Sequence, residues 1–220
     1  MDIVIVGAGG HGKVVLDIIR AEGRHSPIAF VDADTSIAGT RVGGVPVIGA
    51  INMLPKLRQQ KVRGAIVAIG DNRARLRYAA LLAEQGFELV NAIHPAASIS
   101  ATAALGVNLV AAPGAIVCTD ARIADSVIIN TGAIVDHECQ IEAGAHICPS
   151  ACLGGRVQVG SAAFIGLGAK IIQCLSVGEH AIVGAGAVVI RHVPAHATVV
   201  GVPARVIKID AAAEEPVLQG

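Results

Sequence analysis

The sequence is poor in aromatic residues and has no excess of either charge, and both shortages limit what the protein can bind. Aromatic residues make up 2% of the 220 residues, with three Phe, one Tyr and no Trp. Proteins that bind single-stranded nucleic acids stack the bases on aromatic side chains. The 17 Lys and Arg residues balance the 17 Asp and Glu residues, so the broad basic surface of a nucleic-acid-binding protein is also missing. We therefore expect no nucleic-acid partner.

Long hydrophobic runs and paired-cysteine motifs are missing too. No apolar run reaches the roughly 18 residues that would indicate a membrane span, and the first residues lack the basic segment and cleavage site of a signal peptide. The five cysteines form no Cys-x-x-Cys motif, and an odd number of cysteines without a signal peptide indicates reduced thiols. We expect a cytoplasmic protein with no membrane partner.

Two kinds of catalytic site lack their sequence signatures. The eight histidines include no close triplet that would suit zinc, and no Gly-x-Ser-x-Gly motif marks a nucleophilic serine. We therefore expect no metal and no covalent acyl-enzyme.

Residues 1–92 alternate strand-like and helical segments. Short apolar runs predict strands and 3.6-residue spacing predicts helices. The strands are expected at 3–6, 29–31, 45–48 and 65–69, and the helices at 14–19 and 73–85. This alternation predicts a parallel sheet with crossover helices. The segment is too short for both halves of a dinucleotide-binding fold, so we predict a Rossmann-like half domain.

A glycine turn joins the first strand to its helix. The turn reads Gly7-Ala8-Gly9-Gly10-His11-Gly12. Glycines at this place let phosphates approach the backbone at a helix N-terminus, and His11 is a candidate donor to a phosphate. We interpret the turn as a mononucleotide or nucleotide-diphosphate site, with an NAD site and a purely structural turn as alternatives. Asp32 ends the next strand, and Gly70 to Asn72 end a later one, so both are expected along the same sheet edge.

From residue 93 the sequence has a period of six. Of the 17 positions taken every sixth residue from Ile93 to Val189, sixteen are Ile, Leu or Val; all 17 positions four residues further on are Ala, Val, Leu or Cys. A period of six fits neither a helix nor a simple strand and is typical of a hexapeptide β-helix. We predict this β-helix for residues 93–208, closed by an end cap that begins at Pro194, and a tail in residues 209–220.

One charged cluster stands out in the apolar repeats. It reads Val135-Asp136-His137-Glu138. A neutral His137 can accept a proton, and a neighbouring carboxylate can hold one ring nitrogen. A contact between His137 and Glu138 requires a bend in the strand, because adjacent strand residues point to opposite faces. A surface polar cluster is the alternative.

Two further polar residues flank this cluster. His146 lies nine residues after His137, half of an 18-residue coil, so the two histidines can meet only across a subunit boundary. Asn130 precedes the cluster by one hexad and is a candidate amide donor, with a structural turn residue as the alternative.

Taken together, these motifs resemble those of the sugar acyltransferases of the left-handed β-helix superfamily, in the sialic-acid O-acetyltransferase-like group. This group includes bacillosamine-pathway and perosamine N-acetyltransferases, and the resemblance covers residues 2–208. The motifs that carry it are the glycine turn, Ala68-Ile69-Gly70-Asp71-Asn72, Asn130-Thr131-Gly132-Ala133, Asp136-His137-Glu138 and Gly201-Val202-Pro203-Ala204.

The resemblance implies a ligand and a role for each motif. A nucleotide-diphosphate sugar would bind at Gly9, Gly10, His11, Asp32 and Gly70. The β-helix would form a homotrimer with acetyl-CoA between adjacent subunits. His137 would be the catalytic base and Glu138 would tune it. The residues implied to contact the acetyl-CoA are His146, Leu167 and Ala185.

We predict direct acetyl transfer from acetyl-CoA to a 4-amino-4,6-dideoxy sugar carried on a nucleotide. The sequence leaves three alternatives: O-acetylation of a sialic-acid-type hydroxyl, an NAD-dependent enzyme and a non-catalytic scaffold.

Overall fold

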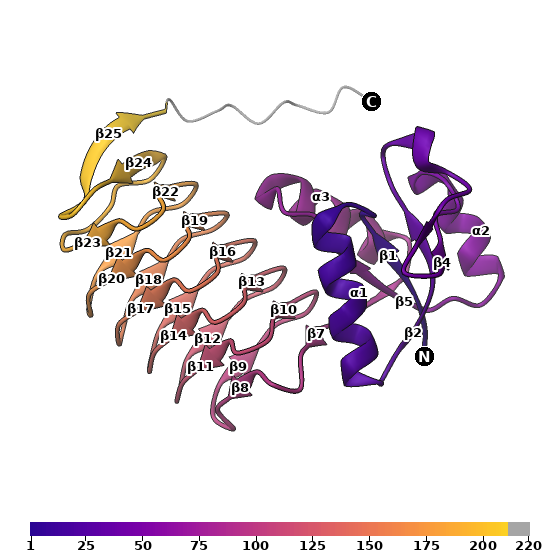
Figure 1. Ribbon diagram of the computed structural model, residues 1–220, viewed down its shortest axis with the longest axis horizontal. Coiled ribbons are helices and arrows are strands. Elements are labelled where there is room, and N and C mark those ends of the chain that lie inside the picture. The colour runs from indigo at the N-terminus through magenta and orange to yellow at the C-terminus, as the bar shows by residue number, and fades with distance from the viewer. Residues whose placement is uncertain (211–220) are drawn as a thin grey trace.

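The computed structural model describes residues 1–210 and begins with a four-stranded parallel sheet in the order β2-β1-β5-β6 (Figure 1). The sheet consists of β1 (Asp2–Val6), β2 (Ser26–Val31), β5 (Gly64–Val67) and β6 (Glu88–Leu89). Strands β1 and β5 are almost entirely buried, as expected for a parallel sheet covered on both faces. Helices α1 (Gly10–Glu22), α2 (Leu54–Gln59) and α3 (Asn72–Glu84) complete this α/β part, with two short 3₁₀ turns at Thr35–Ile37 and Ile51–Met53.

Besides the two-residue strand β6, which was not predicted, two details of the α/β part differ from the sequence-based expectation. The segment 45–48 contributes β4 (Val45–Pro46), which pairs antiparallel with β3 (Arg41–Val42) in a hairpin outside the sheet. The glycines that precede β4 turn the chain back, with positive φ at both Gly43 and Gly44. Helix α2 was not predicted, because its six residues are too few to show a clear 3.6-residue period.

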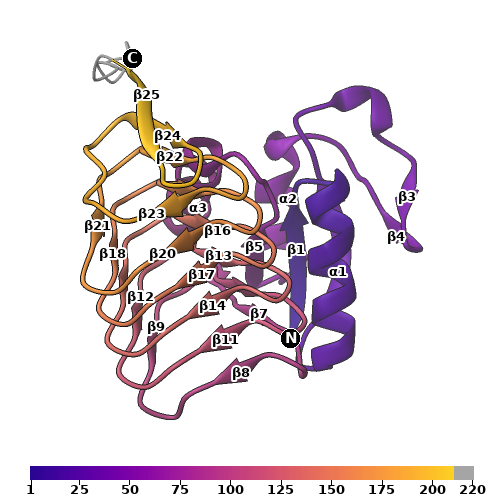
Figure 2. The same cartoon turned by 60° about the vertical axis from the view of Figure 1, so that its left-hand side comes forward.

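The rest of the described chain is a three-sided parallel β-helix (Figure 2). We call its sides faces 1, 2 and 3. Face 1 contains β7 (Ala92–Ile93), β10 (Val110–Ala111), β13 (Ile128–Ile129), β16 (His146–Ile147), β19 (Phe164–Ile165) and β22 (Ile182–Val183). Face 2 contains β8 (Ser98–Ile99), β11 (Ile116–Val117), β14 (Ile134–Val135), β17 (Cys152–Leu153), β20 (Lys170–Ile171) and β23 (Val188–Val189). Face 3 contains β9 (Ala104–Leu105), β12 (Arg122–Ile123), β15 (Gln140–Ile141), β18 (Gln158–Val159) and β21 (Ser176–Val177).

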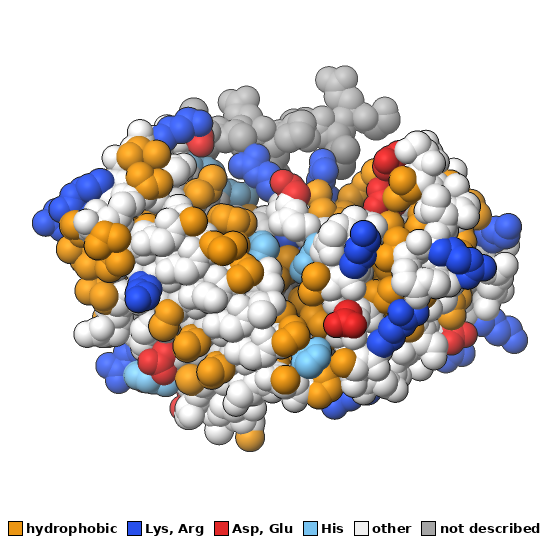
Figure 3. Space-filling model, in the orientation of Figure 1, with side chains coloured by type: hydrophobic (Ala, Val, Ile, Leu, Met, Phe, Trp, Pro, Cys, Tyr) orange, Lys and Arg blue, Asp and Glu red, His pale blue; other side chains and the backbone are white. Residues whose placement is uncertain are grey.

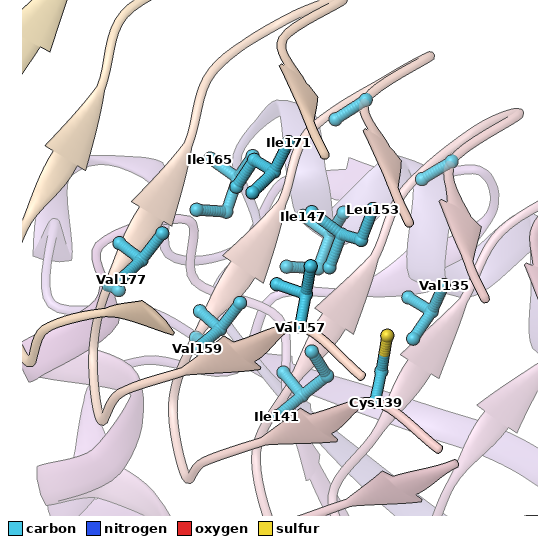
Figure 4. Packing of buried hydrophobic residues seen from close by; sticks show 14 of the residues in the cluster. Val135, Cys139, Ile141, Ile147, Leu153, Val157, Val159, Ile165, Ile171 and Val177 are labelled. Atoms are coloured by element: carbon cyan, nitrogen blue, oxygen red, sulfur yellow. The ribbon is translucent and has the colours of Figure 1, made fainter. Parts of the chain in front are cut away.

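Each strand pairs with the strand 18 residues later, so three hexads make one coil. Val110, for example, pairs with Ile128, and Ile128 with His146. The second residue of each strand points inward, and the small residue four positions later joins it in one continuous apolar core (Figure 4). The structure thus confirms the predicted α/β half domain followed by a β-helix of hexapeptide repeats.

From residue 108 to residue 186 the chain turns each corner through a residue with positive φ. Glu138 and Arg156 do so between faces 2 and 3, with φ of 56° and 62°, and Ser126 does so between faces 3 and 1 with φ of 59°. We name the corners edge 1–2, edge 2–3 and edge 3–1 after the faces that they join.

The β-helix ends in an antiparallel hairpin of β24 (Ala197–Val200) and β25 (Arg205–Ile209). Strand β24 extends face 1, so the residues expected to form an end cap do cover the last coil. Of the expected tail, residues 211–220 lie outside the described residues. None of the helices between residues 1 and 210 has the length and apolar composition needed to span a bilayer.

The two parts of the chain share a core. The outward residues of the first three face-1 strands, Ala92, Val110 and Ile128, are fully buried in the same cluster as β1 and α1 residues. The α/β part therefore sits on the early coils of face 1 (Figure 2).

Candidate active site

A cavity of about 640 Å³ opens at the carboxyl ends of β1, β2 and β5. Its lining includes five of the six residues expected to bind the nucleotide sugar in this part of the chain, namely Gly9, Gly10, His11, Asp32 and Gly70, and lacks the sixth, Asn72. A Cβ atom added at Gly9, Gly10 or Gly70 would meet nothing within 4 Å. The bare backbone of the turn therefore faces open space that a phosphate can enter.

The glycine turn is held in shape by Asp32. One carboxylate oxygen accepts the backbone N–H of Ala8 at 2.6 Å and the other accepts that of Asp34 at 2.9 Å. Gly12 lies so close to the carbonyl of Gly7 that a side chain there would clash with it. Asp32 thus shapes the cavity in addition to lining it.

A buried arginine, which the sequence analysis missed, joins α3 to edge 3–1. The Arg75 side chain is fully buried, and no carboxylate of residues 1–210 hydrogen-bonds to its guanidinium. It donates from Nε to the carbonyl of Ser126 at 2.7 Å and from Nη2 to that of Gly144 at 2.7 Å. Nη1 donates to the carbonyl of Ile69 at 3.0 Å. Burial lowers the pKa of Arg75 to about 10, so the group stays charged at neutral pH.

Asn72 belongs to the same junction. Its amide nitrogen donates to the carbonyls of Ala162 and Ala163 at 2.9 and 3.1 Å, and its side-chain oxygen accepts from Arg75 Nη2 at 2.8 Å. The amide is therefore occupied by protein partners, and Asn72 is not among the residues that line the cavity at the carboxyl ends of β1, β2 and β5. Its expected contact with the sugar nucleotide stays a prediction.

Two histidines at this junction are held neutral. Burial, reinforced by the Arg75 charge, lowers the pKa of His11 to about 4 and that of His146 to about 3. The Asn130 amide donates to His146 Nε2 at 3.1 Å, which leaves the proton on Nδ1. His146 Nδ1 and His11 Nε2 are buried and have no hydrogen-bond partner in the described part of the chain. Histidine side chains are visible along the boundary between the two parts (Figure 3).

His137 lies elsewhere, on the exposed edge 2–3. Its Nδ1 is 3.0 Å from Glu138 Oε2, and its backbone N–H donates to Asp136 Oδ1 at 2.7 Å. The positive φ of Glu138 supplies the bend that the sequence analysis required for this contact. With Nδ1–H donated to a carboxylate, Nε2 is left free to accept a proton.

The His137 ring packs against Gly155, one coil further on. A Cβ atom at position 155 would lie 2.3 Å from Nε2 of His137. Gly155 has no positive φ, so its backbone itself tolerates a side chain. The glycine is therefore required for the position of the imidazole and not for the turn.

For the predicted role of His137 as the base, we expect Gly155→Ala to lower kcat by about 100-fold, because a displacement of about 1 Å at a catalytic group has an effect of that size. Steady-state kinetics with both substrates measures the loss. Gln173→Ala, at the equivalent position one coil later, is the matched control and should retain wild-type rates. Full activity of Gly155→Ala would mean that the ring position does not matter.

The residues expected along the acetyl-CoA path lie on a different edge. Leu167 and Ala185 fall on edge 1–2, where Leu167 is 59% exposed, and His146 is on the adjoining strand of face 1. Asn130, the candidate amide donor to the substrate, is on the same edge 1–2. Face 2 separates this edge from His137. One chain therefore does not bring the expected base and the expected cofactor residues together.

Three residues of this region were not predicted as site residues from the sequence. Arg77 and Tyr78 of α3 line the nucleotide cavity, and Arg75 joins the two parts of the chain. Arg75 shares the spacing i, i+4, i+7 with the buried Ala79 and Leu82, and this spacing would have placed it on the buried side of α3. Within residues 1–210, no group of three or more His, Cys, Asp or Glu side chains is placed to hold a metal ion.

The N-terminal part of the chain matches a known domain family. Residues 2–82 match the family described as the PglD N-terminal domain. No curated protein sequence matches the chain.

Solved structures match over nearly the full length. Perosamine N-acetyltransferase from Caulobacter crescentus, solved with CoA and GDP-perosamine in a variant with one histidine replaced by asparagine, is 44% identical with a TM-score of 0.91; the match covers 94% of this chain and 97% of that one. The acetyltransferase domain of PglB from Neisseria gonorrhoeae FA1090, solved with acetyl coenzyme A, is 39% identical over 94% and 98% of the two chains, with a TM-score of 0.89. WeeI from Acinetobacter baumannii AYE is 25% identical over 94% and 100%, with a TM-score of 0.67.

Proposed function

Because this chain belongs to the hexapeptide-repeat sugar acyltransferases, we propose that it transfers the acetyl group of acetyl-CoA to the amine of a nucleotide-linked amino sugar. The observation that carries the proposal is the His137–Glu138 pair, with 3.0 Å between Nδ1 and Oε2, on the exposed edge of this fold. An imidazole held in this way can take a proton from an amine.

The cavity at the sheet edge supports the choice of substrate. Its open glycine backbone suits a diphosphate, and Arg77 and Tyr78 add a cation and a ring to the lining. A relative that shares 44% of its sequence was solved with GDP-perosamine and CoA. We therefore propose a nucleotide-diphosphate 4-amino-4,6-dideoxy sugar as acceptor, bound at Gly9, Gly10, His11, Asp32 and Gly70.

A homotrimer with its active sites between subunits would complete the site. Four of the six outward residues of face 2 are apolar (Ile116, Ile134, Cys152 and Val188, with Ser98 and Lys170), whereas those of face 3 are mostly polar (Arg122, Gln140, Gln158 and Ser176, with Ala104). An apolar side of a prism favours contact with another subunit. If face 2 packs in the trimer, edge 2–3 of one subunit lies beside edge 1–2 of the next, and His137 reaches acetyl-CoA bound near His146, Leu167 and Ala185. Asn130, on the same edge 1–2, is the proposed amide donor to the sugar substrate.

The proposed chemistry is direct transfer. Binding favours the unprotonated amine, whose nitrogen attacks the thioester carbonyl carbon. His137 Nε2 takes the proton that this nitrogen loses, with Glu138 holding the Nδ1 side of the ring. The carbon–sulfur bond then breaks, and CoA leaves as a thiolate that receives the proton from His137. Alignment of both substrates in one site supplies the proximity contribution.

We also place the reaction in the cytoplasm. All five cysteines are free thiols, which fits a reducing compartment.

The test of the proposed function is an acetylation assay. The protein is incubated with acetyl-CoA and GDP-, UDP- or dTDP-linked 4-amino-4,6-dideoxy sugars, and separately with CMP-sialic acid. CoA release and product mass are measured. We expect an acetylated amino sugar whose acetyl group survives mild alkali, as an amide does.

The other results of this assay identify the alternatives. An alkali-labile acetyl group on the sialic acid would indicate O-acetylation. Stabilisation by NAD but not by acetyl-CoA in a melting experiment would indicate an NAD-dependent enzyme. Absence of CoA release with every acceptor would contradict the proposal.

A further inference from the structure

We propose that Arg156 is a positioning residue for the catalytic base and acts through Glu138. This inference rests on the proposed function of His137. It assigns a role to a side chain that hydrogen-bonds to Glu138, on a residue whose backbone N–H donates to the carbonyl of His137 at 2.9 Å.

The geometry forms a three-membered chain across two coils. Arg156 is 18 residues after Glu138, so it occupies the same place on edge 2–3 in the next coil. Its Nε lies 3.0 Å from Glu138 Oε2, the same oxygen that is 3.0 Å from His137 Nδ1. Both corner residues have positive φ, so consecutive turns present their side chains along the same edge.

The shared oxygen lets Arg156 fix the carboxylate that orients the imidazole. The Glu138 side chain is 49% exposed, and a carboxylate this open has several accessible rotamers. A planar guanidinium that donates to Oε2 restricts these rotamers to the one that meets His137. The same contacts with Arg156 and His137 lower the pKa of Glu138, so the carboxylate stays ionised.

Stability does not account for this ion pair. The Arg156 side chain is 62% exposed, and exposed ion pairs contribute little to folding because water and salt screen them. The pair does, however, leave the His137 tautomer defined, with the proton on Nδ1 and the lone pair on Nε2. We therefore assign the pair to the orientation of the base.

The test is a double-mutant cycle between Arg156→Met and Glu138→Gln. We expect Arg156→Met to lower kcat by about tenfold, which is smaller than the loss of about 100-fold that a 1 Å misplacement causes. The KM for both substrates and the melting temperature should stay unchanged. Arg156→Lys should recover part of the rate. In the Glu138→Gln background Arg156→Met should have no further effect, because the carboxylate on which it acts is already lost. Arg122→Met, an exposed arginine on face 3, is the matched control.

Two outcomes would overturn the inference. One is a tenfold loss that persists in the Glu138→Gln background. The other is a raised KM with an unchanged kcat, which would place Arg156 in substrate binding.

A second readout keeps this inference separate from the proposed function. The ¹⁵N chemical shifts of the His137 ring report its tautomer without any substrate. Arg156→Met should shift the signals toward a mixture of tautomers, as Glu138→Gln should. Unchanged shifts would reject the positioning role even if the wild-type protein showed no acetylation.

Discussion

Replacement of His137 by alanine is expected to lower kcat by about 10²–10⁴-fold, the usual contribution of a general base. The KM values should change little, because the ring is proposed to act in the transition state and not to anchor either substrate. The fold should be unaffected, since the side chain is 50% exposed and lies on an outer edge of the β-helix. Steady-state kinetics with acetyl-CoA and the amino-sugar nucleotide gives both constants.

A matched control uses another histidine of the same edge. His192 lies three coils later, and its Nδ1 accepts the backbone N–H of Ser176 at 3.0 Å. His192→Ala should have near-normal kcat. If His137→Ala also turned over at a near-normal rate, the base would have to be another group.

The second large effect concerns stability. Arg75→Met should lower the free energy of unfolding by about 3–5 kcal/mol, because methionine leaves the buried carbonyls of Ser126 and Gly144 without a donor at about 1–3 kcal/mol each. The side-chain oxygen of Asn72 also loses its donor. Chemical denaturation followed by circular dichroism measures this change.

Two companion variants separate this explanation from a general effect of losing an arginine. Arg75→Lys keeps the charge but cannot reach all the acceptors, and its stability should be intermediate. Arg77→Met removes an exposed arginine two residues further along α3 and should change stability by no more than about 0.5 kcal/mol. A loss below about 1 kcal/mol for Arg75→Met would show that the junction does not depend on this side chain.

The β-helix was predictable because its signal is local and repeated. Every hexad has to place one large residue inward and one small residue near the corner, as at Val135 and Cys139, and no insertion disturbs the register. The sheet of the α/β part was also predictable, because buried runs such as 3–6 reflect burial on both faces. The short elements were missed, since β6 has two residues and α2 has six, too few for a periodic pattern.

The candidate site was predictable only where the residues that interact are also neighbours in the sequence. His137 and Glu138 are adjacent in the chain, and their contact needed only a bend. The junction depends on distant pairs instead: Arg75 binds the carbonyls of Ser126 and Gly144, 51 and 69 residues away. Every residue type has a backbone carbonyl, so a sequence cannot indicate which carbonyl will accept a hydrogen bond from an arginine.

The coil that runs from Ser126 to Gly144 contains both the carbonyls that hold Arg75 and the imidazole of His137. The contact of α3 with the β-helix and the proposed base therefore belong to a single turn of backbone. Whole 18-residue turns could be added after Gly144 without rotating His137 relative to the Arg75 junction. An insertion of half a turn between Ser126 and His137 would place His137 on another side of the prism.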